Sequence, residues 1–245
     1  MRNSKDDQWR RFNEPYQVFG PLMRIGDIAA ESREAGFGYY DRNAQTALKQ
    51  IADYAYSFLA QPHAELGRDG NVCPFVPTAL EKGTFRATVA NTSDIDSVEA
   101  AMTNILRVFL DMPPTSPDAG RVAEGEQIYK TILVGFPAVG PEAAPQIIDE
   151  LQKRLKATYV RAGMMIGQFH PSCPGEGLHN KNFRPFQAPV ACLAVRHITK
   201  YDAPFMDKDE YLDGYLKLFG LEGMRRIETL LARQQKRCPV QHLAN

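Results

Sequence analysis

Short continuous apolar runs and longer segments of helical period alternate along the chain. Met164–Phe169, Val190–Val195 and Thr131–Phe136 are apolar at nearly every position, which is typical of strands covered on both faces. Val72–Val76 and Phe85–Ala90 flank a glycine-containing turn, and we expect them to pair as a β-hairpin. Together the five runs predict one sheet.

Segments in which apolar residues recur every three or four positions separate these runs. Asp94 is a suitable N-cap for one segment, and Pro141 suits the first turn of another. The predicted helices are Asn43–Ala60, Asp94–Asp111, Pro141–Ala162, Asp207–Phe219 and Leu221–Lys236. Strands that alternate with helices favour a mixed β-sheet covered by helices. We therefore expect an α/β fold of α+β-like character, built as a single domain over residues 1–245, with a C-terminal helical pair.

Two segments lack a clear period. Residues 1–40 are irregular but rich in aromatic side chains such as Trp9 and Phe37, so we expect them to pack over the main body. Pro113–Gln127 is rich in Pro, Gly, Ser and acidic residues, which predicts a mobile, exposed linker that is dispensable for folding. Residues 72–205 are then the core that carries the site.

The composition is that of an ordinary globular protein with balanced charge. Lys+Arg and Asp+Glu number 29 each, so no global field attracts nucleic acid or an anionic membrane. No apolar run is long enough for a spanning helix, and the charged N-terminus lacks the apolar stretch of a secretory signal. The four cysteines form no CxxC pair, which predicts reduced thiols in a cytoplasmic protein. We expect no nucleic-acid or membrane partner, and a homodimer is one possible assembly.

The most reactive side chains gather between Met164 and Phe205. His170 directly follows a predicted strand, where sheets of this kind usually bind ligands. An imidazole at that position can ligate a metal or a haem iron, or it can simply hydrogen-bond the loop. A zinc set can be assembled from His170, Cys173, His179 and His197, but its spacing matches no known zinc module.

Other groups in this core also have a functional and a structural interpretation. Asn180–Arg184 offers cations and an aromatic ring that can hold a planar carboxylate-bearing ligand, or it is a solvated loop tip. Cys73 and Cys173 can act as nucleophiles beside a cation, although cysteines are more often small buried side chains. Arg196 and Asp202 flank the last strand and can form a structural ion pair.

Several motifs of this core resemble those of haem-dependent bacterial N-oxygenases of the guanitoxin-pathway hydroxylase type. The first is Cys73-Pro-Phe, followed by Ala79 and by Gly83-Thr-Phe-Arg86. The second is a strand ending in the step His170-Pro171 before a basic, aromatic loop. The layout covers roughly residues 72–205, and the same stretch also looks like a group of bacterial proteins without an assigned function.

The resemblance implies a haem-dependent oxygenase that acts on nitrogen of a small amine or amino-acid-like substrate. His170 would be the proximal iron ligand of haem b, with His179 or His197 as the distal hydrogen-bond donor. Phe183, Arg184 and Arg86 would contact the cofactor, and an unidentified electron donor would be needed. The alternative is a non-catalytic small-metabolite-binding or scaffold protein that uses the same pocket.

Overall fold

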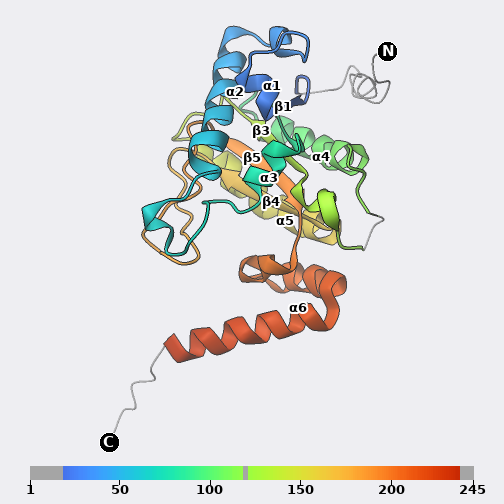
Figure 1. The fold of residues 1–245 in the computed structure, drawn as a ribbon, viewed down its shortest axis with the longest axis vertical. Coiled ribbons are helices and arrows are strands. Elements are labelled where there is room, and N and C mark those ends of the chain that lie inside the picture. The colour runs from blue at the N-terminus through green and yellow to red at the C-terminus, as the bar shows by residue number, and fades with distance from the viewer. Residues whose placement is uncertain (1–18, 118–120, 238–245) are drawn as a thin grey trace, which may run out of the picture.

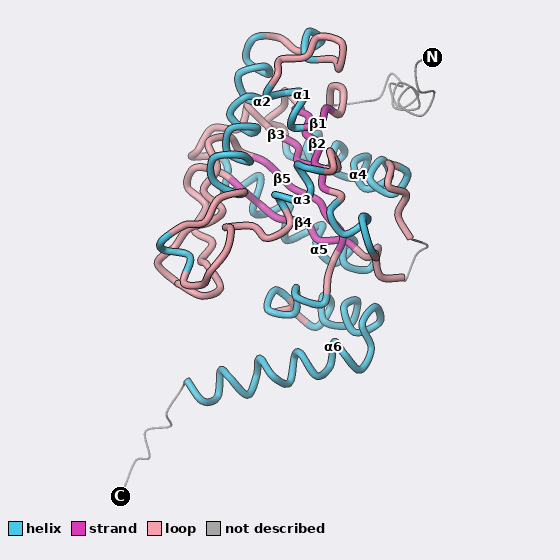
Figure 2. The backbone as a smooth tube through the Cα atoms, viewed as in Figure 1, coloured by secondary structure: helices cyan, strands magenta, loops and turns pink. Residues whose placement is uncertain are grey.

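The structure, a computed structural model, describes residues 19–117 and 121–237. Its centre is a five-stranded mixed sheet surrounded by helices (Figures 1 and 2). The strands, in the order β1-β2-β3-β5-β4, are β1 Met23–Arg24, β2 Phe85–Val89, β3 Thr131–Gly135, β5 Cys192–His197 and β4 Met164–Phe169. β2 pairs with β3 in parallel, whereas β5 is antiparallel to both β3 and β4. Consequently β2, β3 and β4 run in one direction, and their carboxyl ends lie at the same edge of the sheet.

Helices cover both faces of this sheet and extend from one end of it. The longer ones are α2 Arg42–Tyr54, α4 Ile95–Asp111, α5 Glu150–Arg161 and α6 Asp209–Arg237, and the short ones are α1 Ile25–Ala29 and α3 Val76–Glu81. Two π-helical segments, η3 Ala55–Leu59 and η6 Pro145–Asp149, extend α2 and precede α5. The remaining turns of 3₁₀-helix are η2 Phe37–Tyr39, η4 Ala64–Leu66, η5 Gly125–Tyr129 and η7 Lys200–Phe205. None of the described helices is long and apolar enough to cross a membrane.

Each central strand contributes to two hydrophobic cores. In β3, Ile132 and Val134 pack with α4 and α5, while Leu133 packs with α2 on the opposite face. Because successive side chains of a strand point to opposite faces, a strand between two cores must be apolar at every position. This explains the continuous apolar runs, and it confirms the predicted mixed α+β sheet.

The predicted hairpin is wrong. Val72–Val76 forms no strand, and Val76 instead begins helix α3, with Pro77 in its first turn. Proline lacks an N–H for a sheet ladder but suits the start of a helix. β2 pairs with β1 and β3, so its partners lie 62–64 and 46 residues away in sequence rather than next to it. The last strand also begins later than predicted, at Cys192 instead of Val190.

Two predicted helical features are confirmed. The Asp94 side chain accepts a hydrogen bond from the backbone N–H of Ser97 at 2.9 Å and so caps α4. The C-terminal helical pair is present, because Gly220, with φ of 50°, interrupts α6 between Phe219 and Leu221. The predicted start at Asp207 is two residues early, since α6 begins at Asp209.

The segments without a clear period contain more structure than predicted. Residues 1–18 lie outside the described part of the chain, but residues 19–40 include β1, α1 and η2, with Phe19 and Phe37 buried. Within Pro113–Gln127, Gln127 donates to the Thr115 carbonyl at 2.8 Å, and Ser116 accepts from Lys130 at 2.8 Å. Whether the segment is dispensable stays a prediction, but these bonds anchor both of its ends.

The close contact of β3 with α2 gives a test of the packing. A Cβ added at Gly135 would lie 2.8 Å from Ile51 Cδ1 and 3.0 Å from Val89 Cγ1, whereas one at Gly140 would meet nothing within 4 Å. We expect Gly135→Ala to lower the free energy of unfolding by about 1–3 kcal/mol through overpacking. Gly140→Ala, the matched control, should leave it within about 0.5 kcal/mol or raise it slightly. Urea unfolding of both variants checks this, and equal midpoints for the two would contradict the packing account.

Candidate functional site

The candidate site lies at the edge of the sheet where three strands end. β2, β3 and β4 all have their carboxyl ends there, and His170 directly follows the last residue of β4. Loops that leave such ends form the usual ligand-binding crevice of open sheets. The edge holds two neighbouring features, a buried cluster around His170 and a surface pocket beside α2.

The His170 ring is held between two partners and has no exposed surface. Its Nε2 lies 3.1 Å from Oδ1 of Asp149, the last residue of η6, and its Nδ1 lies 3.2 Å from Oγ of Ser172. The Ser172 hydroxyl in turn donates to the carbonyl of Pro141 at 3.1 Å. The ring therefore joins the end of β4 to the start of the α5 helix and to the loop after β3.

Cys173 is the third side chain of this cluster. Its backbone N–H donates to the His170 carbonyl at 3.0 Å, which closes a turn and brings the thiol back toward the imidazole. Burial raises the pKa of the Cys173 thiol, and the charge of Asp149 adds to that effect. A thiol held in its neutral form is a weak nucleophile, so the geometry does not favour nucleophilic catalysis by Cys173.

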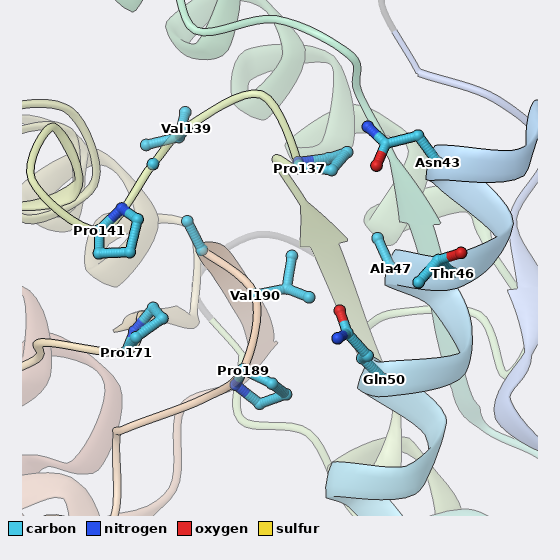
Figure 3. A pocket seen from close by; sticks show the side chains of 12 residues that line it. Asn43, Thr46, Ala47, Gln50, Pro137, Val139, Pro141, Pro171, Pro189 and Val190 are labelled. Atoms are coloured by element: carbon cyan, nitrogen blue, oxygen red, sulfur yellow. The ribbon is translucent and has the colours of Figure 1, made fainter.

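A surface pocket of about 200 Å³ lies beside the cluster (Figure 3). Its walls come from α2, from the loop after β3 and from the two ends of the long loop 170–191. The polar residues that line it are Asn43, Thr46 and Gln50, and none of its lining side chains is charged. The Thr46 hydroxyl donates to the Arg42 carbonyl of its own helix at 2.8 Å. The rest of the lining is Ala47, Pro137, Val139, Gly140, Pro141, Pro171, Pro189, Val190 and Ala191.

The predicted loop residues hold the loop itself together. Phe183 is buried and stacks on His63, with ring centroids 4.7 Å apart. The Arg184 guanidinium donates to the carbonyls of Lys181 and Phe183 and lies 3.9 Å from Glu176. His179 is exposed. In this arrangement Arg184 stabilises the loop through backbone carbonyls.

Two further predicted residues lie far from His170. His197 is opposite Met164 at the other end of the β4–β5 pair, six residues or about 20 Å from His170 along the strands. Arg86 lies on β2, three strand spacings or about 14 Å from β4. The structure therefore does not bring His197 or Arg86 together with His170.

His197 belongs to a second buried cluster at that opposite edge. Its Nε2 lies 3.3 Å from Ser116 Oγ, and its ring packs edge-on against Phe109 at 4.9 Å between centroids. The Lys130 ammonium donates to Ser116 Oγ and to the carbonyls of Phe109 and Met112 at the end of α4. Burial lowers the pKa of Lys130 to about 7, and the charge of Asp111 partly opposes this shift. The cluster serves as a cap for the carboxyl end of α4.

The predicted ion pair of the last strand is present. The Arg196 guanidinium donates two bonds to Asp202, at 2.8 and 2.5 Å. Asp202 also accepts from the backbone N–H and the hydroxyl of Thr199, which caps η7. These contacts are structural, because they join β5 to the helical segment that leads to α6.

Haem at His170 does not fit this arrangement. Both ring nitrogens have protein partners, and the side chain has no exposed surface through which a macrocycle could approach. The neighbouring pocket, at about 200 Å³, is smaller than the ~300 Å³ at which pockets for drug-sized ligands begin. Iron ligation by His170 would require the ring to leave Asp149 and the loop to open, so haem binding stays a prediction.

Sequence reasoning missed Asp149 and the polar face of α2. Asp149 lies 21 residues before His170 inside a helical pattern, so no local motif connects the two. Asn43, Thr46 and Gln50 recur at helical spacing, which was the only available signal for a polar stripe on α2.

Comparison with known proteins shows the family but no function. A family model described as a domain of unknown function, DUF6875, matches residues 48–229. The match spans more than half of the chain, which therefore belongs to this family. No curated protein and no solved structure matches the chain significantly. The matched region includes strands β2 to β5 and the whole His170 cluster, whereas Asn43 and Thr46 lie just before it.

The buried position of His197 predicts a pH dependence of stability. Burial, and next the charge of Lys130, lower the pKa of His197 from 6.5 to about 4. Between these values the unfolded chain binds the proton and the folded chain does not, so the stability is complete above pH 6.5 and falls as the pH drops toward 4. From pH 6.5 to 5 this residue should account for a loss of about 1.5 kcal/mol. Unfolding curves at both pH values should show the loss reduced in His197→Asn and retained in His179→Asn; an equal loss in both variants would contradict the assignment.

Proposed function

We propose that this member of the DUF6875 family binds a small, uncharged, polar metabolite in the pocket beside α2. The observation that carries the proposal is a pocket at the carboxyl edge of the sheet that is lined by two amides and a hydroxyl but by no charged side chain. This is the non-catalytic metabolite-binding alternative that the sequence left open.

The lining favours a neutral ligand with hydrogen-bonding groups. Among the described residues, the amides of Asn43 and Gln50 form no hydrogen bond with another protein group, so their donors and acceptors are available to a ligand. A charged ligand would lose hydration without gaining an opposite charge, which disfavours it.

The walls of the pocket support binding of a rigidly held ligand. Four prolines line it, and the loop that carries Pro171 and Pro189 is fixed to the rest of the protein. Tyr54 of α2 donates to the Pro185 carbonyl at 2.7 Å, and Asn180 donates to the Glu65 carbonyl at 2.8 Å. Walls that are formed before the ligand arrives lower the entropy cost of binding.

The side-chain amides give a direct test of ligand binding. In a titration with uncharged probes such as acetamide, urea and glycerol, we expect the NMR signals of the Asn43 and Gln50 side-chain amides to shift. The amide of Asn104 on α4 is the internal control and should not move. Gln50→Ala should weaken binding by about two- to tenfold, the effect of one neutral hydrogen bond, and Asn104→Ala should have no effect. Equal shifts with acetate and methylammonium, or no shift at Asn43 and Gln50, would contradict the proposal.

An absorbance spectrum separates this proposal from the haem-dependent oxygenase implied by the resemblance. Protein purified from haem-supplemented cells should show no stoichiometric Soret band, because His170 is sealed by Asp149 and Ser172. A full Soret band that disappears in His170→Ala while the far-ultraviolet dichroism is unchanged would instead support the oxygenase and overturn our assignment.

A further inference from the structure

The buried cluster of Asp149, His170 and Cys173 is separate from the pocket lining and has chemistry that pocket binding does not use. One oxygen, one nitrogen and one sulfur of these residues all lie within 4.8 Å of one another. The side chain of His170 is fully buried and that of Asp149 is only 14% exposed, and Cys173 is buried as well. We propose that these three side chains bind one zinc ion.

The hydrogen bonds around His170 leave the lone pair of Nε2 facing the carboxylate. A carbonyl oxygen can only accept, so the Ser172 hydroxyl donates to Pro141, and its oxygen accepts from the N–H at Nδ1 of His170. With the ring proton on Nδ1, the Nε2 lone pair lies 3.1 Å from the Asp149 oxygen. Two acceptors at this distance repel each other unless a proton or a metal cation lies between them, and a cation there would be ligated by both. The arrangement is also the one by which metal-binding histidines are commonly oriented, with the second nitrogen donating to a neighbouring oxygen.

The separations suit a tetrahedral ion. Metal bonds of ~2.0–2.2 Å to nitrogen and oxygen place two such donors about 3.3 Å apart, close to the observed 3.1 Å. No two ligand atoms of the cluster are more than 4.8 Å apart. A side-chain movement on the order of 1 Å would therefore bring all three to bonding distance of one tetrahedral ion. The turn from His170 to Cys173 is closed by a 3.0 Å backbone hydrogen bond, and it keeps the ligand atoms of both side chains within 4.8 Å of each other.

The donor set selects the metal. Calcium and magnesium prefer all-oxygen sites, whereas a thiolate together with an imidazole and a carboxylate suits zinc. A bound zinc ion would also neutralise the buried carboxylate and stabilise the thiolate. Because the described residues provide three ligands, the fourth position falls to water or another small donor.

Zinc at this position would connect two of the segments that form the candidate site. Asp149 comes from the start of the α5 helix, and His170 and Cys173 come from the beginning of the long loop. Pro141, which accepts from Ser172, and Pro171, which follows His170, both line the pocket. The ion therefore fixes the loop that forms one wall of the pocket, but its binding does not depend on what the pocket holds.

Cobalt substitution tests the site with a direct signal. Full-length protein stripped with a chelator should bind one equivalent of Co²⁺, with the visible bands of a tetrahedral ion and a near-ultraviolet thiolate-to-cobalt band. Zinc added afterwards should displace the cobalt and remove these bands. Cys173→Ala should lose the thiolate band, while Cys73→Ser, a cysteine outside the cluster, should keep it at full intensity.

Two further variants test the roles of the oxygen ligand and of the orienting hydroxyl. Asp149→Asn should weaken Co²⁺ binding by at least tenfold. Ser172→Ala should weaken it by about ten- to a hundredfold while keeping the thiolate band, because Ser172 orients His170 without touching the ion. Far-ultraviolet dichroism identifies any variant that fails to fold. The variants that do fold then show whether the cluster binds the ion.

Two results would contradict the proposed zinc site. Parent protein that binds no stoichiometric Co²⁺ or Zn²⁺ would overturn the site and leave His170 and Asp149 as a plain hydrogen-bonded pair. A thiolate band that persists in Cys173→Ala but is lost in Cys73→Ser would place the metal elsewhere. Neither result bears on the amide signals of Asn43 and Gln50, so failure of the metal site and failure of metabolite binding are distinguishable.

Discussion

The contact between His170 and Asp149 is the constraint on which the candidate site depends. It joins the last position of β4 to the start of the α5 helix, across the junction between sheet and helix layer, and the His170 side chain is completely buried. A buried polar group that loses its partner typically costs about 1–3 kcal/mol, so the partners of the His170 ring cannot be replaced freely. Through Ser172 the same ring also holds the loop after β3, and three separate segments thereby meet at one imidazole.

Much of the fold could be predicted from the hydrophobic pattern because the sheet lies between two cores. Strands β3 and β4 are apolar at nearly every position, and the N-cap Asp94 marks the beginning of α4. The hairpin prediction failed because sheet partners are not encoded locally, and β2 pairs in parallel with β3, far along the chain. In addition, the run Val72–Val76 forms bends and turns, and helix α3 begins at its last residue, with Pro77 in the first turn. Parallel pairing always requires a crossover, and here α4 supplies it.

The candidate site was predicted only in part. His170 was placed correctly at the carboxyl end of a strand, since both the run before it and the proline after it are visible in the sequence. His197, which the sequence grouped with it, lies at the opposite end of the β4–β5 pair because the two strands are antiparallel. Asp149 could not be found from spacing, since a ligand contributed by a neighbouring helix appears only when helix and strand are packed together.

The same geometry separates the two functional interpretations of this family member. An imidazole that serves as an axial haem ligand needs a free nitrogen and an open side, whereas His170 has partners at both nitrogens and no exposed surface. The zinc ion that we propose needs neither an open side nor a large cavity, because the ligand atoms of Asp149, His170 and Cys173 already lie close together. The polar pocket beside α2 is the binding site that we propose, and Pro171, next to His170, lies in its wall.

X-ray absorption at the zinc edge of the zinc-loaded protein tests the central claim most directly. Ligation by Asp149, His170 and Cys173 predicts one sulfur neighbour at about 2.3 Å and nitrogen or oxygen neighbours at about 2.0–2.2 Å. A first shell that contains only nitrogen and oxygen, or one with several sulfur atoms, would contradict the account.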